Sequence, residues 1–255
     1  MTNIILCGCG GRMGQAIVRA CEASGDLRVV AGVDVNASAV APACAFPVYT
    51  SVSDFPERAD VIIDFSHHTA LPSLLDYATK TGTPLVVATT GHTEEETAMM
   101  KNASEQVAIF FSRNMSIGIN LLIELCKTAA KTLGVAFDVE IVEKHHNQKL
   151  DAPSGTALMI AEAIAEERET TEFVYDRHAV RKKREPSEIG IHAIRGGTIV
   201  GEHDAIFAGK DEIVTLSHTA TSREVFAEGA LRAAAYLAGK SAGMYNMSDL
   251  IREQA

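Results

Sequence analysis

The sequence lacks any run of about 18 apolar residues, the length of helix that crosses a bilayer. It also lacks internal repeats, low-complexity tracts and proline-rich linkers. An excess of positive charge is missing too, because 33 acidic residues outnumber 23 basic ones and give a formal net charge of -10. We therefore expect no membrane span, and neither nucleic acid nor an anionic membrane as the main partner.

Cysteine is scarce and shows no paired pattern. The five cysteines are odd in number and scattered, which favours a reducing compartment over a disulfide framework. The first residues lack the charged head and long apolar run of a secretory signal, so we expect a cytoplasmic protein. Cys7 and Cys9 could suggest a metal, but they lie where a strand meets a glycine loop, and we interpret them as small packing residues. No metal site is predicted.

The chain of 255 residues can bury a core as one large domain or two modest ones. Its first 115 residues alternate strand patterns with helical ones, which predicts a parallel, doubly wound α/β sheet. Ligands of such sheets bind beyond the carboxyl ends of the strands. Thr93 and Glu96 have the spacing of a capping box at the start of one helix. The expected strands cover residues 3–7, 27–33, 60–65, 83–88 and 107–111.

A glycine-rich loop follows the first strand and precedes a helix, which is the context that dinucleotide binding requires. The strict G-x-G-x-x-G spacing fails because position 13 is Met. The physics is unchanged, since no side chain blocks a pyrophosphate and the helix N-terminus faces it. The predicted cofactor contacts in this loop are Gly8, Cys9, Gly10, Gly11, Arg12, Met13 and Gly14.

Asp34 ends the second strand about 20 residues beyond the glycines, where an acidic residue binds the adenine ribose. Val35 and Asn36 follow it, so no neighbouring cation welcomes a 2′-phosphate. A carboxylate here favours NADH over NADPH. Arg12 in the loop could soften that preference. The alternative interpretation is a tight turn followed by a surface aspartate.

Residues 143–156, EKHHNQKLDAPSGT, gather two histidines, two lysines and a glutamate in one short segment. The alternation before this segment predicts a strand that puts Glu143 and His145 on one face and turns His146 away. The apolar spacing after it predicts a helix, with Ser154 or Asp151 as the N-cap.

The backbone N–H groups of Gly155 and Thr156 then fall in the first turn of that helix, where the dipole and the donors favour an anion. Lys149 and a protonated His145 could donate a proton nearby. Such a site suits a small anionic substrate that must be protonated. The alternative is a solvated basic loop with a chance pair of histidines. A metal is disfavoured, because neighbouring strand residues point apart.

A helix over residues 117–133, closed by Gly134, marks the predicted domain boundary. Beyond it the pattern predicts an α+β domain built on an open mixed sheet, with hairpin turns at residues 196–197 and 209–211. The basic run 181–184 predicts a solvated loop, and the alternative is that it adds positive charge near an acidic substrate. Thr221 and Glu224 have capping-box spacing before a last helix that ends near Leu237.

The segment from Glu143 to Thr156 resembles the signature of the dihydrodipicolinate reductases, the 4-hydroxy-tetrahydrodipicolinate reductases of diaminopimelate and lysine biosynthesis. The resemblance covers essentially the whole chain, with further motifs at residues 8–14, 88–91 and 195–203. It implies NAD(P)H-dependent reduction of a cyclic, unsaturated dicarboxylate, with hydride delivered to C4 after loss of the 4-hydroxyl as water. It also implies a cytoplasmic homotetramer. Residues 1–115 and 222–255 would form the Rossmann-type dinucleotide-binding domain, and residues 116–221 the substrate-binding and tetramerisation domain.

The resemblance also implies residue roles. His145 and Lys149 would donate protons, His146 would contact substrate, and Gly155 with Thr156 would hold a carboxylate. Relatives often carry Phe at position 115 and Asp at position 198, so the nicotinamide packing and the role of the 195–203 motif stay open. The family often accepts NADPH as well as NADH. Cofactor contacts beyond the glycine loop and Asp34 would be Phe65, Ala88, Thr89, Thr90, Ser112, Arg113, Asn114 and Met115. No role is predicted for His67, His68 and His92.

Two other functions remain open on the sequence. Another NAD(P)-linked reductase of amino or imino acids would share the nucleotide half without requiring Lys149 beside His145. A non-catalytic dinucleotide sensor would bind NADH without turning over any imine.

Overall fold

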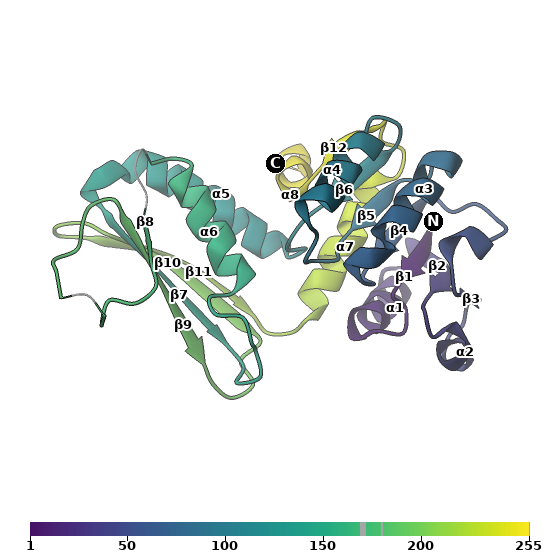
Figure 1. The fold of residues 1–255 in the computed structure, drawn as a ribbon, viewed down its shortest axis with the longest axis horizontal. Coiled ribbons are helices and arrows are strands. Elements are labelled where there is room, and N and C mark those ends of the chain that lie inside the picture. Colours follow the sequence, from purple (N-terminus) through teal and green to yellow (C-terminus); the bar gives the residue numbers. More distant parts are fainter. Residues whose placement is uncertain (169–171, 180, 255) are drawn as a thin grey trace. The chain divides into compact units, whose positions relative to one another are not determined.

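The computed structural model describes residues 1–168, 172–179 and 181–254. The chain forms two compact units, Met1–Ser116 with Arg223–Ala255, and Ile117–Ser222 (Figure 1). The first unit contains a parallel sheet and the second a mixed one. These sheets confirm the predicted fold class. No helix in the described ranges is both long and apolar enough to span a membrane.

The first unit is built on a seven-stranded sheet in the order β12-β6-β5-β4-β1-β2-β3, and every strand pair is parallel. The two edge strands were not predicted, because runs of two and three residues are too short to show a period. The strands are β1 (Thr2–Cys7), β2 (Leu27–Val33), β3 (Val48–Tyr49), β4 (Val61–Asp64), β5 (Leu85–Val87), β6 (Ala108–Phe111) and β12 (Gly243–Tyr245). The helices are α1 (Arg12–Ser24), α2 (Ala37–Val40), α3 (Leu71–Thr81), α4 (Glu94–Ala103), α7 (Glu224–Leu237) and α8 (Met247–Gln254).

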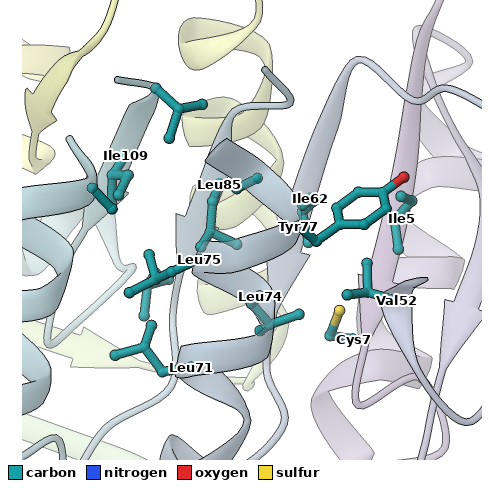
Figure 2. Packing of buried hydrophobic residues seen from close by; sticks show 14 of the residues in the cluster. Ile5, Cys7, Val52, Ile62, Leu71, Leu74, Leu75, Tyr77, Leu85 and Ile109 are labelled. Carbon is teal, nitrogen blue, oxygen red and sulfur yellow. The ribbon is translucent and has the colours of Figure 1, made fainter. Parts of the chain in front are cut away.

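The core of the first unit includes one face of α3 packed against the central strands. Leu71, Leu74 and Leu75 lie at helical spacing and are at most 5% exposed. They belong to one buried cluster with Ile62 of β4 and Leu85 of β5 (Figure 2). Each buried leucine contributes about 1.5–3 kcal/mol. The packing fixes the strands whose carboxyl ends carry the predicted nucleotide contacts.

The cysteines at the end of β1 are packing residues, as the sequence predicted. Cys7 and Cys9 are buried, and a Cβ added to Gly32 would lie 2.6 Å from Cys9 Sγ. Burial is the main cause that raises the pKa of Cys9 to about 11. All five cysteines of the chain are free thiols.

The second unit is built on a five-stranded mixed sheet in the order β11-β10-β7-β9-β8. Helices α5 (Ile117–Leu133) and α6 (Gly155–Ala165) cover one of its faces (Figure 1). The observed bounds of α5 confirm the predicted helix over residues 117–133. The strands are β7 (Asp138–His145), β8 (Glu172–Val174), β9 (Glu188–Arg195), β10 (Gly201–Ala208) and β11 (Ile213–Ala220).

One predicted hairpin is wrong and the other is confirmed. Residues 196–197 join β9 to β10, but these strands do not pair with each other, because β7 lies between them. β9 runs parallel to β7 and β10 runs antiparallel to it. Residues 209–211 do close a hairpin, in which β10 pairs with β11 in continuous register.

The two predicted capping boxes also differ in outcome. At α4, the Thr93 hydroxyl accepts the Glu96 N–H while the Glu96 carboxylate accepts the Thr93 N–H, so the box is confirmed. At α7, the helix starts at Glu224 itself with Arg223 at the N-cap, which makes no side-chain cap. A capping box requires the glutamate in the third helical position, so Thr221 and Glu224 are out of register.

The basic run 181–184 is a loop, as predicted, and residues 181–183 are exposed, but two of its side chains bind carboxylates of the sheet. Arg184 is 17% exposed, and its Nε donates to Glu140 Oε1 at 3.1 Å. Lys182 Nζ lies 3.2 Å from Oε1 of the fully buried Glu188. Lys182 and Arg184 therefore bind the segment before β9 to β9 and β7.

Candidate active site

The glycine loop of the first unit lies at the carboxyl end of β1. Gly11 is the N-cap of α1, and the first turn of α1 contains no acidic residue, so the helix N-terminus favours an anion. Gly8 has a φ of 77°, and a Cβ there would lie 2.6 Å from the carbonyl oxygen of Phe65. A Cβ on Gly14 would collide with the carbonyl oxygen of Gly8. Glycine at these two positions lets the helix, the loop and a ligand approach closely.

Asp34 follows β2 and supports this loop. Its Oδ2 accepts the Gly10 N–H at 3.1 Å, and its Oδ1 accepts the Asn36 N–H at 2.9 Å. A Cβ on Gly10 would lie 2.9 Å from the same Oδ2. The carboxylate is thereby held beside the loop at the edge where a ribose would bind.

A buried carboxylate, not predicted as a site residue, joins the ends of β4 and β5. Asp64 accepts hydrogen bonds from the Ser66 N–H at 3.0 Å and from the Thr89 hydroxyl at 2.8 Å. The Ala88 N–H donates to the Asp64 carbonyl at 3.0 Å. Burial raises the pKa of Asp64 despite these hydrogen bonds, which act in the opposite direction. Asp64 therefore fixes two of the predicted cofactor contacts.

The turn after β6 is held by its own side chains. The Ser112 hydroxyl donates to the Asn114 carbonyl at 2.7 Å, and Asn114 Oδ1 accepts the Ser116 N–H at 2.8 Å. Met115 is 2% exposed, and a Cβ on Gly229 of α7 would collide with its carbonyl oxygen. The Met115 side chain is thus part of the core.

The predicted cofactor contacts of the first unit follow the ends of adjacent parallel strands, so the fold brings them to one edge of the sheet. Arg12, Thr90 and Arg113 are exposed there. Buried members of the set are Cys9, Gly14, Ala88, Thr89, Ser112 and Met115.

Three histidines without a predicted role lie beside α4. His68 Nδ1 is 2.9 Å from Glu96 Oε1, and His92 Nδ1 is 3.5 Å from Glu96 Oε2. The ring centroids of His67 and His68 are 4.4 Å apart. Among the described residues, no group of three or more His, Cys, Asp or Glu side chains is arranged to hold a metal ion.

The second unit brings the proton-donor candidate and the helix start together through Glu143. The Glu143 side chain is fully buried, and His145 Nδ1 lies 2.6 Å from its Oε2. Its Oε1 accepts the Ser154 N–H at 3.0 Å. Ser154 is the N-cap of α6, and its hydroxyl accepts the Ala157 N–H at 3.2 Å. Gly155 therefore opens α6 next to the end of β7.

Arg195 completes the surroundings of Glu143. Its Nη1 donates to Oε2 at 2.8 Å and its Nη2 to Oε1 at 2.7 Å, the two-pronged geometry that favours an ionised carboxylate. Burial alone would raise the pKa of Glu143, but hydrogen bonds from His145, Arg195 and Ser154 outweigh it and lower the pKa to about 2. Glu143 thus stays charged at neutral pH.

The other predicted residues of the second unit lie in the segment between β7 and α6. Lys149 is 22% exposed, and its Nζ lies 2.8 Å from Asp151 Oδ1. His146 follows β7 and is half-buried. Thr156 is the second residue of α6, next to Gly155.

Sequence reasoning gave Glu143 no role, although it placed Glu143 and His145 on one strand face. That shared face was the available signal, because a carboxylate two residues before a histidine on a strand can reach its ring. Arg195 and His203 were noted as a motif without an assigned role. Their position beside Glu143 depends on strand order, which no local pattern shows.

Two family models together match nearly the whole chain. The model described as "Dihydrodipicolinate reductase, N-terminus" matches residues 2–115, and the one described as "Dihydrodipicolinate reductase, C-terminus" matches residues 118–251. The chain belongs to the dihydrodipicolinate reductase family. This confirms the resemblance inferred from residues 143–156, and with it an oxidoreductase with a Rossmann-type domain for NAD(P)H.

Relatives of similar length support the same family. The 4-hydroxy-tetrahydrodipicolinate reductase of Caldanaerobacter subterraneus subsp. tengcongensis is 52% identical over 254 residues, which are 99% of each chain. That of Clostridium novyi is 47% identical over 255 residues, which are 100% of each chain. The dipicolinate-bound dihydrodipicolinate reductase from Paenisporosarcina sp. TG-14 has a TM-score of 0.78 at 24% identity, covering 96% of this chain and 97% of that one. At that identity the comparison shows a shared fold.

Proposed function

We propose that the protein reduces 4-hydroxy-tetrahydrodipicolinate to tetrahydrodipicolinate with NAD(P)H and releases water, as a step of diaminopimelate and lysine biosynthesis. Family membership and full-length relatives that carry this enzyme's name support the reaction. The structural observation that carries the proposal is Glu143, which binds the ring of His145 and the N-terminus of α6 at once. This contact supports the proposal, because an imidazole, which can donate a proton, lies next to a helix start that suits an anion.

The first unit would bind the cofactor. The glycine loop and the N-terminus of α1 would hold the pyrophosphate, and Asp34 the adenine ribose. The ends of β4, β5 and β6 would carry the contacts to the nicotinamide side. NADH is the preferred cofactor in this proposal, because Asp34 adds a negative charge and neither Val35 nor Asn36 offsets a 2′-phosphate. NADPH would be accepted more weakly.

The second unit would bind the substrate. The first-turn backbone of α6 at Gly155 and Thr156 would hold one carboxylate, and His146 would contact the substrate. Loss of the 4-hydroxyl with a proton gives water and a conjugated cyclic imine. Hydride then adds to C4, and the enamine that forms takes up a proton at the carbon between C4 and the imine carbon. His145 and Lys149 would supply these protons. The 12% exposure of the His145 side chain and the position of Lys149, whose Nζ pairs with Asp151, support this assignment.

We also infer a homotetramer that assembles through the second unit. Helices α5 and α6 cover one face of its sheet, whereas β11 exposes Ile213, Thr215, Ser217 and Thr219 on alternate positions. Ile213 is 68% exposed, and such a face suits pairing with another copy. Sedimentation analysis should give a mass of four chains. The five free thiols support a reducing, cytoplasmic location.

The test of the proposed function is a coupled assay of NADH oxidation. The substrate is made in place by condensing pyruvate with aspartate semialdehyde, and NADPH is assayed in parallel. His145→Ala should lower turnover by about 10²- to 10⁴-fold, the usual contribution of a general acid. The Kd of NADH should not change, because His145 lies outside the first unit.

His178→Ala is a suitable control for this variant. His178 is an exposed histidine in the segment between β8 and β9, and its backbone N–H donates to Asp176 Oδ1 at 2.8 Å. Turnover should be retained in this control. Full turnover in His145→Ala would remove His145 from the mechanism, and failure of the native chain to oxidise either NADH or NADPH with this substrate would refute the reaction itself. Oxidation of NADH with another imino acid would then point to the other reductase class.

A further inference from the structure

The motif of Arg195, Gly197, Gly201 and His203 surrounds the end of β7. In the strand register, Arg195 of β9 lies opposite His145, and His203 of β10 lies opposite Glu143. The two strands flank β7 on its two sides. The motif therefore starts on one side of the Glu143–His145 pair and ends on the other.

Glu143 determines which nitrogen of His145 carries a proton. An ionised carboxylate only accepts hydrogen bonds, so the contact of 2.6 Å between Glu143 Oε2 and His145 Nδ1 requires a hydrogen on Nδ1. The ring is therefore the Nδ1–H tautomer when neutral. Within the described part of the chain Nε2 has no hydrogen-bond partner, so it is the nitrogen that can exchange a proton with a ligand.

Arg195 binds Glu143. Together with the two glycines after it, Arg195 also binds the chain from His145 onward. Besides its two bonds to Glu143, Arg195 Nη2 donates to the Asp151 carbonyl at 2.6 Å. The Gly196 N–H donates to the His145 carbonyl at 2.9 Å, and the Gly197 carbonyl accepts the Asn147 N–H at 3.2 Å. Gly197 has a φ of 48°, a conformation that glycine adopts readily.

Gly201 and His203 of β10 define the other side of the ring. A Cβ on Gly201 would lie 3.1 Å from His145 Nε2, so the absence of a side chain leaves room for that nitrogen. The rings of His203 and His145 meet edge to face, with centroids 5.2 Å apart. His203 Nε2 bonds the Ser154 hydroxyl at 3.0 Å. Burial first, and then the charge of His145, lower the pKa of His203 to about 4, so His203 is a neutral neighbour at pH 7.

We propose that Glu143, Arg195, Gly201 and His203 are positioning residues that hold His145 by Nδ1 and direct Nε2 toward the substrate. The proposal rests on the proposed function, in which His145 donates a proton. Arg195 fixes the Glu143 carboxylate, and the carboxylate fixes the ring. Gly201 and His203 leave the His145 ring one orientation, and neither adds a positive charge beside it.

Other charged groups near the His145 ring belong to the neighbouring strands and to the segment after β7. Lys149 and Asp151 lie in the segment between β7 and α6 and pair with each other. His218 of β11 and Lys149 both act electrostatically on His203. Arg195 is neutralised by Glu143 across two hydrogen bonds. The carboxylate that faces the His145 ring is therefore that of Glu143, which Arg195 also binds.

The first measurement is made on the native chain, with one variant used only to assign the signal. Chains labelled with ¹⁵N-histidine report which ring nitrogen carries hydrogen, and His145→Gln identifies the signal of His145. The neutral ring should show a protonated Nδ1 and a bare Nε2. A signal from a bare Nδ1 would overturn the positioning role, even if the enzyme is fully active.

The second measurement uses Glu143→Gln, which keeps the shape and removes the charge. Turnover should fall by about 10- to 100-fold, less than the loss of the general acid itself. The alkaline limb of the turnover profile should move to lower pH, because the carboxylate favours the protonated ring. The Kd of NADH should stay unchanged. Arg195→Lys should show a smaller loss, since a lysine keeps the charge but not the two-pronged bond.

Glu188→Gln is the matched control. Glu188 is equally buried on β9, and its carboxylate is held by Arg177 at 2.6 Å and by Lys182 at 3.2 Å. This control should lose stability without changing the His145 tautomer or the pH profile of turnover. An equal shift of the profile in both variants would mean that Glu143 acts only through stability, which would overturn the proposal. Loss of activity in His145→Ala combined with an unchanged profile in Glu143→Gln would overturn the positioning role alone, whereas full activity in His145→Ala would refute the proton-donor assignment.

Discussion

Replacing Asp34 by Asn tests how the protein chooses between NADH and NADPH. The Asp34 carboxylate lies beside the glycine loop, and a 2′-phosphate bound at the same edge would meet its charge. Two unit charges about 4 Å apart interact by about 1 kcal/mol in bulk water and about 4 kcal/mol near a protein surface. At about 1.4 kcal/mol per factor of ten, Asp34→Asn should raise the NADPH to NADH ratio of kcat/KM by about fivefold to several hundred-fold.

The ratio is the correct observable because the substitution also affects the loop. The two carboxylate oxygens of Asp34 accept the N–H groups of Gly10 and Asn36, and asparagine supplies only one acceptor. Losing one such bond costs about 0.5–1.5 kcal/mol. Both cofactors share that loss, so it cancels in the ratio. The carboxylate repels the 2′-phosphate of NADPH and would bind the ribose hydroxyl of NADH, so removing its charge changes the ratio in the same direction through both cofactors.

Initial rates with each cofactor at low and high salt give the result. The change should be larger at low salt, because ions screen an exposed charge. Asp60→Asn is the control, since Asp60 also accepts a backbone N–H, from Asn3 at 2.7 Å, but lies before β4 at the opposite edge of the sheet. A ratio in Asp34→Asn within twofold of that of Asp60→Asn would refute the assignment of Asp34 as the selecting charge.

Two further predictions concern stability. Ser154→Ala should destabilise the start of α6 by about 2–4 kcal/mol, of which about 1 comes from the lost cap and about 1–3 from the buried His203 left without its partner. The control Thr93→Ala should cost α4 only the cap. Hydrogen exchange of the two helices measures both losses, and equal losses would exclude the His203 contribution. The pKa values of Glu143 and Glu188 are lowered from 4.5 to about 2, so the stability that these groups contribute should be complete above pH 4.5 and lost as the pH falls toward 2. Urea midpoints should therefore converge for the native chain and Glu143→Gln over that interval, and a constant difference would contradict the linkage.

The parts of the fold that depend on local pattern could be predicted from the sequence. The alternation before residue 146 placed Glu143 and His145 on one face of β7, and in the structure the two side chains are in contact. The Thr93–Glu96 box was found because its residues and the helix start are in register. The same spacing failed at Thr221, because α7 starts at Glu224 itself, so the glutamate is in the first helical position instead of the third.

The candidate site could be predicted only in part, for a physical reason. His145, Lys149 and Gly155 lie within one segment, so spacing alone brings them near each other. Asp64 and Arg195 act on residues that are distant in sequence, Thr89 and Glu143. A burial pattern indicates that such a charged residue has a partner, but strand order determines which residue that partner is.

Strand order decides whether the 195–203 motif can act on His145 at all. Had residues 196–197 closed a hairpin, β9 and β10 would pair with each other, and only one of them could lie beside β7. Either Arg195 would reach Glu143 or His203 would reach His145, but not both. With β7 inserted between them, the connection passes around the end of β7, and both of its ends meet the Glu143–His145 pair. A parallel neighbour of β7 on one side and an antiparallel one on the other thus bring two loop glycines, Arg195 and His203 to the surroundings of His145.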